Sequence, residues 1–260
     1  MTKPVLQPKP AESVAAGQWS VSGNGDRVES DHGGRWSSID LRDPQRGIAV
    51  PPDGLLGLDL RSPARLTEHW LRGADVTAVY EPDDARRLRA TAMWRLGATG
   101  GGVDVWELVV SAQTSLQQSD SSLAVASDIE AAECLYGDWV PDDHQAGGGS
   151  GAAVHWGTAA SSRTTCVLLR RPSSPGGTHA GGGRHTSVLV AVHPADARGL
   201  RVHLQDGRGR VECRLFSTAV EKGVLLRGRV LAATGPATDD TRWATAAVEA
   251  FAASPPMLST

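Results

Sequence analysis

Cysteine is scarce in this sequence of 260 residues, and its spacing excludes two classes of small fold. The three cysteines, Cys134, Cys166 and Cys213, are odd in number and lie far apart, without a CxxC pair. A disulfide framework or a zinc knuckle requires paired or closely spaced cysteines, so neither is expected here. We expect three reduced thiols, most of them buried.

Long hydrophobic runs are also absent. No apolar stretch approaches the roughly 20 residues that a membrane helix needs. The N-terminal segment, MTKPVLQPKPAESVAAGQ, contains Pro4, Pro8 and Pro10 and lacks the apolar segment of a signal peptide. These absences predict a soluble, cytoplasmic chain with no membrane partner.

An excess of positive charge is missing too, and so are the common catalytic motifs. The net charge of −3 and the pI near 6.2 exclude a global basic surface, so we expect no nucleic-acid partner. The patterns GxxxxGK[ST], HExxH and GxSxG do not occur. The sequence therefore predicts no cofactor and no metal site.

Short runs in which apolar and polar residues alternate recur from Gln18 onward. Turn-forming segments such as DPQRG, PPDG, GATGGG and DGRG separate them. This rhythm predicts an all-β protein with antiparallel strands. We expect a disordered tail over 1–17, one large sandwich over 18–233, and a helix and tail over 234–260. The length also allows two sandwiches in tandem. The glycine-rich stretches 142–151 and 173–185 are expected to be long surface loops.

One segment has the pattern of a helix. TDDTRWATAAVEAFAA, residues 238–253, is rich in alanine, and Thr238 or Asp239 is positioned to cap its start. Trp243, Ala247 and Phe251 recur on one helical face. Residues 127–135 fit a short helix or a strand about equally well.

Two hairpins allow the buried faces to be predicted. Across GATGGG, pairing Trp94 with Trp106 places an almost wholly apolar set on one face, so both indoles are expected in the core. The second hairpin is LRVHLQDGRGRVECRLF, residues 200–216. Centring its turn between Gly207 and Arg208 makes every inward pair apolar.

The outward face of the second hairpin is the candidate site. In this register His203 lies opposite Glu212, and Arg201 lies opposite Arg214. A carboxylate beside an imidazole makes a plausible proton-transfer pair, whereas two facing arginines favour an anionic ligand. The same face is also explained by simple contact with water.

Two further residues complete the candidate ligand-binding set. Arg227 lies on the next predicted strand, and His193 lies at a strand end just before Pro194. Strand ends beside a hairpin are places where sites open in β-sandwiches.

The predicted length, the meandering strands and the wide polar face are similar to the β-supersandwich of galactose mutarotases and of accessory domains in carbohydrate enzymes. No sequence motif carries this resemblance, so it implies a fold and assigns no residue a role. It implies a carbohydrate-binding or sugar-modifying protein, with a sugar or an anionic small molecule as ligand. In a sugar-modifying enzyme His203 and Glu212 would act as general acid and base.

The alternative is a non-catalytic scaffold or interaction protein with no small-molecule site. The shape of the polar face separates the two hypotheses. A pocket over His203 and Glu212 favours sugar chemistry, and a flat, hydrated face favours a protein partner.

Overall fold

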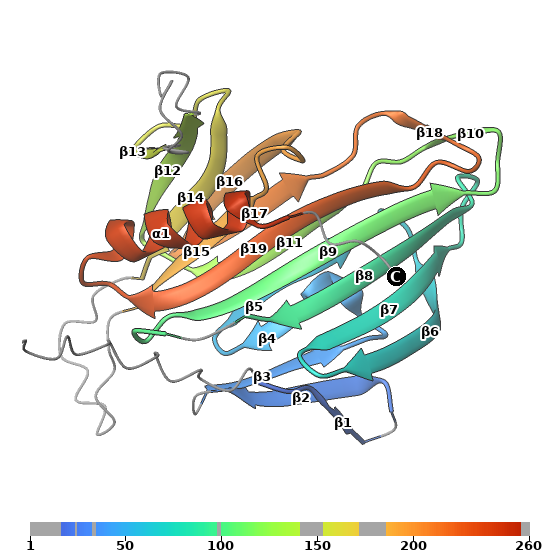
Figure 1. Cartoon of the computed structure of the whole chain (residues 1–260), viewed down its shortest axis with the longest axis horizontal. Coiled ribbons are helices and arrows are strands. Elements are labelled where there is room, and N and C mark those ends of the chain that lie inside the picture. The colour runs from blue at the N-terminus through green and yellow to red at the C-terminus, as the bar shows by residue number, and fades with distance from the viewer. Residues whose placement is uncertain are drawn as a thin grey trace, which may run out of the picture.

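The computed structural model describes residues 17–23, 25–32, 35–97, 100–140, 153–171 and 186–255. Within them, two large antiparallel sheets form a sandwich, and a single α-helix follows the last strand (Figure 1). The predicted all-β sandwich with a C-terminal helix is thus confirmed. Both glycine-rich loops, and residues 1–16 of the predicted tail, lie outside the described residues.

The first sheet has nine strands. In spatial order they are β13 (Ala153–Gly157), β12 (Glu133–Val140), β14 (Thr164–Arg170), β15 (Thr186–Val192), β19 (Leu226–Pro236), β9 (Asp104–Thr114), β8 (Leu88–Leu96), β7 (Asp75–Pro82) and β6 (Ala64–Arg72). Its last sequential strand, β19, lies in the middle and joins the two halves of the sheet.

The second sheet has eight strands. In spatial order they are β1 (Ser20–Ser22), β2 (Arg27–His32), β3 (Arg35–Asp40), β4 (Ile48–Val50), β5 (Asp53–Asp59), β11 (Ala124–Glu130), β17 (Arg208–Arg214) and β16 (Gly199–Gln205). A short 3₁₀ helix, η1 (Pro44–Arg46), connects β3 to β4. Two short strands, β10 (Gln118–Asp120) and β18 (Ala219–Glu221), pair separately.

The main core lies between the two sheets, and both contribute alternate residues to it. On β8 the buried residues are Leu88, Ala90, Ala92, Trp94 and Leu96, every second position. This is the pattern of a sheet that buries one face and leaves the other accessible. Trp94 and Trp106 both belong to the core, as predicted, but they are not direct partners. Trp94 lies opposite Leu108. The alternation of apolar residues determines which face a side chain is on, whereas the length of the connecting loop determines its partner.

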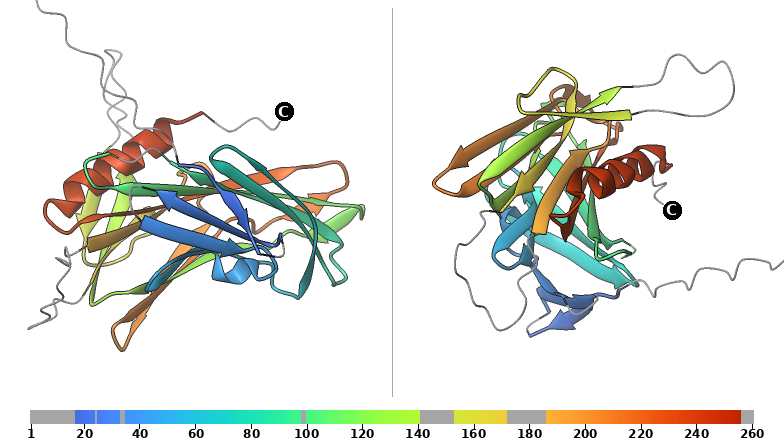
Figure 2. Two further views of the ribbon diagram at one scale, coloured as in Figure 1. Left: turned by 90° about the horizontal axis from the view of Figure 1, so that it is seen from below. Right: turned by 90° about the vertical axis from the view of Figure 1, so that its left-hand side faces the viewer.

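The helix α1 (Asp240–Ala253) covers the outer face of the nine-stranded sheet and creates a second core (Figure 2). Ala244, Val248 and Phe251 of α1 pack there against residues of β14, β15 and β19. β15 is therefore buried on both faces from Ser187 onward, which explains its nearly continuous apolar sequence. At 14 residues α1 is too short to span a membrane, and no other helix among the described residues qualifies.

Of the two alternatives for residues 127–135, the structure shows the strand: they form the end of β11 and the start of β12. Two local predictions need correction. β19 continues to Pro236, beyond the predicted strand limit at 233, because β15 pairs with it along that length. At the start of α1 no side chain caps the helix, since Asp239 has left-handed backbone angles, with φ of 54° and ψ of 33°.

Candidate functional site

The hairpin of β16 and β17 is closed by a tight turn at Asp206 and Gly207. Both residues have positive φ, 51° and 75°, and Gln205 lies opposite Arg208. Positive φ at both central positions is the requirement of a type I′ turn, which aspartate and glycine meet readily. The predicted register, with four residues in the turn, was therefore wrong by two positions.

A shift of two residues keeps every side chain on its predicted face but changes its partner. Arg201 lies opposite Glu212, and His203 lies opposite Arg210. Arg214 lies opposite Gly199, so two arginines do not face each other across this hairpin. The repulsion that suggested an anionic ligand between Arg201 and Arg214 is absent.

Two ion pairs engage charged side chains of the polar face. The guanidinium of Arg210 donates to both carboxylate oxygens of Asp128, at 3.0 and 2.8 Å. The Nε of Arg214 lies 3.2 Å from Oε1 of Glu212 on the same strand. Within the described part of the chain, no hydrogen bond or ion pair joins His203 to Glu212. His203 instead lies with Nε2 3.3 Å from Oε1 of Gln205.

The floor beside Glu212 and Arg214 is made of small residues. Glu212 lies opposite Ala126 on β11, and Ala126 lies opposite Gly57 on β5. Arg214 lies opposite Ala124, the next outward position on β11. Three neighbouring outward positions therefore carry almost no side chain, and all three are buried. Beside them a depression lies between β17 and the elements beyond β5.

The opposite wall of the depression is η1 with the segment that follows β5. A Cβ built on Gly57 would lie 2.0 Å from the carbonyl oxygen of Gln45, so η1 rests directly on this glycine. The result is an open groove of about 670 Å³. Its lining residues are Gln45, Asp59, Arg61, Ser62, Pro63, Glu212 and Arg214.

Sequence reasoning identified Glu212 and Arg214 but missed the other side of the groove. Residues 61–63 carry no functional signal in the sequence, and the side chain of Asp59 accepts a hydrogen bond from the backbone of Arg61 at 2.8 Å. Nothing in the alternating pattern indicates that η1 folds back over β5. Gly47 and Gly57 cannot be replaced without overlap, because a Cβ at either position would meet backbone atoms. These two glycines are the local sign that η1 packs on β5, but the sequence alone does not show which segments they bring together.

Arg227 and His193 lie away from the groove. Arg227 is on β19 of the other sheet, with its Nε 3.4 Å from the hydroxyl of Ser111. His193 follows β15, and its ring meets Phe251 of α1 edge-on, with centroids 5.4 Å apart. Burial, assisted by the positive charge of Arg229, lowers the pKa of His193.

The three thiols are free, as predicted, and two of them are buried. Burial raises the pKa of Cys166 and of Cys213 to about 12. Burial likewise raises the pKa of Cys134 to about 11. Thiols of this kind are protonated at neutral pH, which argues against a nucleophilic role.

No protein-family model and no curated protein matches this sequence. Among solved structures it is similar to a putative aldose 1-epimerase from Escherichia coli K12. The TM-score is 0.42 and the identity 9%, over 85% of this chain and 99% of that one. It is also similar to heparinase III, with a TM-score of 0.34 and 10% identity, over 82% of this chain and 30% of that one. At these scores neither likeness assigns a ligand or an activity.

Proposed function

We propose that this protein binds a carbohydrate in the groove between β17 and η1, without catalysing a reaction there. The observation that carries the proposal is the groove itself. It brings amide, hydroxyl, carboxylate and guanidinium groups together around one hollow. Sugar hydroxyls both donate and accept hydrogen bonds, so a mixed set of donors and acceptors suits them.

Each wall supplies part of that set. Arg214 and Arg61 donate, Asp59 and Glu212 accept, and the amide of Gln45 does both. Arg214 already pairs with Glu212, but Arg61 forms no ion pair with another described residue, so its guanidinium favours saccharides that carry a carboxylate or a sulfate. An acidic oligosaccharide is therefore the ligand that we expect to bind most tightly.

The geometry supports binding better than acid–base catalysis. A general acid and a general base must both come within hydrogen-bond reach of the reacting group. Glu212 lines the groove, whereas His203 is not among its lining residues and lies opposite Arg210. The hollow beside Glu212 also counts against the scaffold alternative, which was expected to have a flat face.

A thermal-shift screen tests the proposal. The panel contains neutral, uronic and sulfated oligosaccharides, each with the parent protein and with Arg214→Ala and Glu212→Gln. Arg208→Ala is the control, because it removes an exposed arginine of the same strand outside the groove.

A ligand present at 100 times its Kd stabilises by about 2.7 kcal/mol. We expect an acidic oligosaccharide to raise the melting temperature of the parent and of Arg208→Ala, and to raise it much less in Arg214→Ala. In Glu212→Gln the rise should be at least as large as in the parent, because this substitution removes a carboxylate that repels an acidic ligand. The proposal is wrong if no saccharide stabilises the protein, or if Arg214→Ala responds like the parent.

A further inference from the structure

Four strands form the edges of the two large sheets, and β16 differs from the other three. β1 has only three residues and β13 only five, and a bulge between Leu66 and Glu68 interrupts the pairing of β6. β16 keeps an unbroken register with β17 over seven residues, and it contains neither lysine nor proline. Short strands, bulges, lysine and proline are the usual protections of a sheet edge against pairing with another chain. β16 is therefore an edge strand without these protections.

The open side of β16 offers backbone hydrogen-bonding groups at every second residue. Gln205 and Arg208 flank the two-residue turn and form the hydrogen-bonded pair next to it. Hydrogen-bonded pairs alternate along an antiparallel hairpin, so the N–H and C=O groups of Leu200, Val202 and Leu204 point away from β17. Among the described residues, no backbone hydrogen bond satisfies these groups on that side.

The opposite sheet extends beyond β16. β16 lies against β14, whereas β12 and β13 continue the nine-stranded sheet past it. Figure 2 shows the hairpin of β16 and β17, in orange-brown, at the margin of the sandwich. Cys134 and Tyr136 of β12 contact the main core but remain partly exposed, because the eight-stranded sheet ends at β16. A further strand beside β16 would bury this surface.

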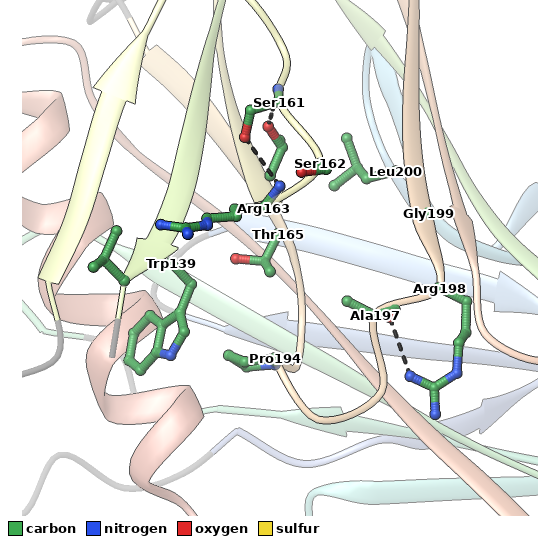
Figure 3. A pocket seen from close by; sticks show the side chains of 12 residues that line it. Trp139, Ser161, Ser162, Arg163, Thr165, Pro194, Ala197, Arg198, Gly199 and Leu200 are labelled. Carbon is green, nitrogen blue, oxygen red and sulfur yellow. Dashed lines mark hydrogen bonds between the residues drawn. The ribbon is translucent and has the colours of Figure 1, made fainter. Parts of the chain in front are cut away.

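A hollow of about 770 Å³ lies at the start of β16, between that strand and the ends of β12 and β14 (Figure 3). Figure 3 shows Leu200 on one side of the hollow and Trp139 on the opposite side. Trp139 also packs against the second core, which limits its movement. The hollow leaves room for an apolar side chain of a segment that pairs with β16 near Leu200.

The outward side chains of β16 include a positive charge and no negative charge. They are Arg201, His203 and Gln205, and all three are exposed. Within the described parts of the chain, no carboxylate lies within ion-pair distance of Arg201. Glu212 lies opposite Arg201 but is paired with Arg214. A carboxylate on an added strand would therefore interact favourably with Arg201.

We propose that β16 binds an extended peptide segment of another protein, which adds a strand to the eight-stranded sheet. Apolar side chains at every second position of the segment cover β12 and enter the hollow, and acidic side chains between them face Arg201. None of the residues that line the saccharide groove lies on β16, so the two proposals are tested independently.

A second copy of this chain fits the edge less well. Pairing the free backbone groups of two β16 strands centres the register on Val202, which places Arg201 opposite His203 and not opposite a carboxylate. The nine-stranded sheet of each copy, which extends past β16, would also reach into the space of the other.

Fluorescence anisotropy with labelled synthetic peptides tests the proposal on the full chain. The probe is a short peptide in which glutamate and valine alternate. One control peptide is methylated on its valine nitrogens, a second is methylated on its glutamate nitrogens, and a third has lysine in place of glutamate. The two methylated peptides differ only in which edge of the added strand can donate hydrogen bonds.

We expect the glutamate–valine peptide to bind. Methylation of the valine nitrogens should weaken binding about tenfold or more, because these N–H groups donate to β16. Methylation of the glutamate nitrogens should have little effect, since they point away from β16. The lysine–valine peptide should bind about tenfold more weakly than the probe, because its charge matches that of Arg201.

Variants of the protein locate the site. Val202→Pro removes a free N–H without removing a hydrogen bond of the hairpin, and proline is tolerated at such edge positions. It should weaken binding of the probe about tenfold or more, whereas Val202→Thr keeps the N–H and should bind like the parent. Arg201→Ala should weaken binding about threefold. Arg72→Ala, which removes an exposed arginine from β6, should leave binding unchanged.

Four results would overturn the proposal. The probe does not bind, the two methylated peptides bind equally well, or a folded Val202→Pro binds the probe like the parent. The fourth is a dimer of the parent in sedimentation velocity that Val202→Pro dissociates, because a second copy would then occupy the edge. Melting curves show whether Val202→Pro is folded. If it is not, the two methylated peptides decide the question on the parent protein.

Discussion

The guanidinium of Arg170, at the end of β14, holds the carboxylate of Asp240, the first residue of α1, through two hydrogen bonds of 2.7 and 2.8 Å. The hydroxyl of Ser187 on β15 donates a third, at 2.8 Å. The Asp240 side chain is only 3% exposed, whereas that of Arg170 is 36% exposed. A carboxylate at the start of a helix also interacts favourably with the helix dipole. This ion pair anchors α1 to the sheet that it covers.

Replacing Asp240 with asparagine should therefore be costly. The substitution leaves Arg170 without its buried partner and weakens the contact with Ser187. We expect the free energy of unfolding to fall by about 1.5–3 kcal/mol, the order of a lost hydrogen bond to a charged group, because Arg170 remains in contact with water. Urea denaturation followed by circular dichroism measures the change.

The matched control for this variant is Asp128→Asn. Asp128 pairs with Arg210, but both side chains of that pair are about half exposed, at 53% and 51%. Exposed pairs contribute about 0–1 kcal/mol, so this substitution should be nearly neutral. Equal losses in the two variants would contradict the anchoring role of Asp240.

The stability that Asp240 contributes should depend on pH. Burial alone would raise the pKa of this carboxyl, but hydrogen bonds from Arg170 and Ser187 outweigh burial and lower the pKa. A carboxyl whose pKa is lowered by folding stabilises the protein above its unfolded pKa, near 3.9, and loses that contribution as the pH falls through the folded value.

The difference in unfolding free energy between the parent and Asp240→Asn should accordingly be constant from pH 7 to about 5. It should then shrink as the pH falls below about 4. Denaturation curves of the two proteins across this range make the measurement. A difference that grows towards low pH would show that the sign of the shift is wrong.

Gly57→Ala should disrupt the wall of the proposed groove. The new methyl group would meet the backbone of Gln45, which cannot move without displacing η1. Overpacking of this kind costs about 1–3 kcal/mol. We expect a loss of that size in denaturation experiments, together with weaker saccharide binding.

Gly199→Ala provides the control for Gly57→Ala. Gly199 lies on the same sheet, at the start of β16, and nothing lies within 4 Å of a Cβ added there. Both stability and saccharide binding should stay close to those of the parent. If Gly57→Ala were as harmless as Gly199→Ala, η1 would not be the wall of a defined groove.

The alternation of apolar residues was sufficient to predict the sandwich and the buried faces. Trp94, Trp106, Val211 and Cys213 are all in the core where the pattern placed them. Register was not predictable from the same pattern, because a shift of two residues leaves the faces unchanged. In the β16–β17 hairpin the positive φ of Asp206 and Gly207 decided between the alternatives.

The groove was only half predictable for a related reason. Glu212 and Arg214 lie on a strand, where alternation indicates which side chains point outward. Asp59, Arg61 and Gln45 lie at a strand end, in a turn and in a 3₁₀ helix, where no periodicity operates. Their convergence depends on η1 packing over Gly57, a tertiary contact between segments that the sequence alone does not place together.

The most direct test of carbohydrate binding in the groove is an NMR titration of the isotope-labelled protein with the best acidic oligosaccharide from the screen. The backbone amides of Gln45, Arg61 and Glu212 report on the groove, because these residues line it from both sides. We expect these signals to shift most, and to remain nearly unchanged when Arg214→Ala is titrated in the same way. Shifts confined to other surfaces, or an unaltered response in Arg214→Ala, would contradict the proposed function.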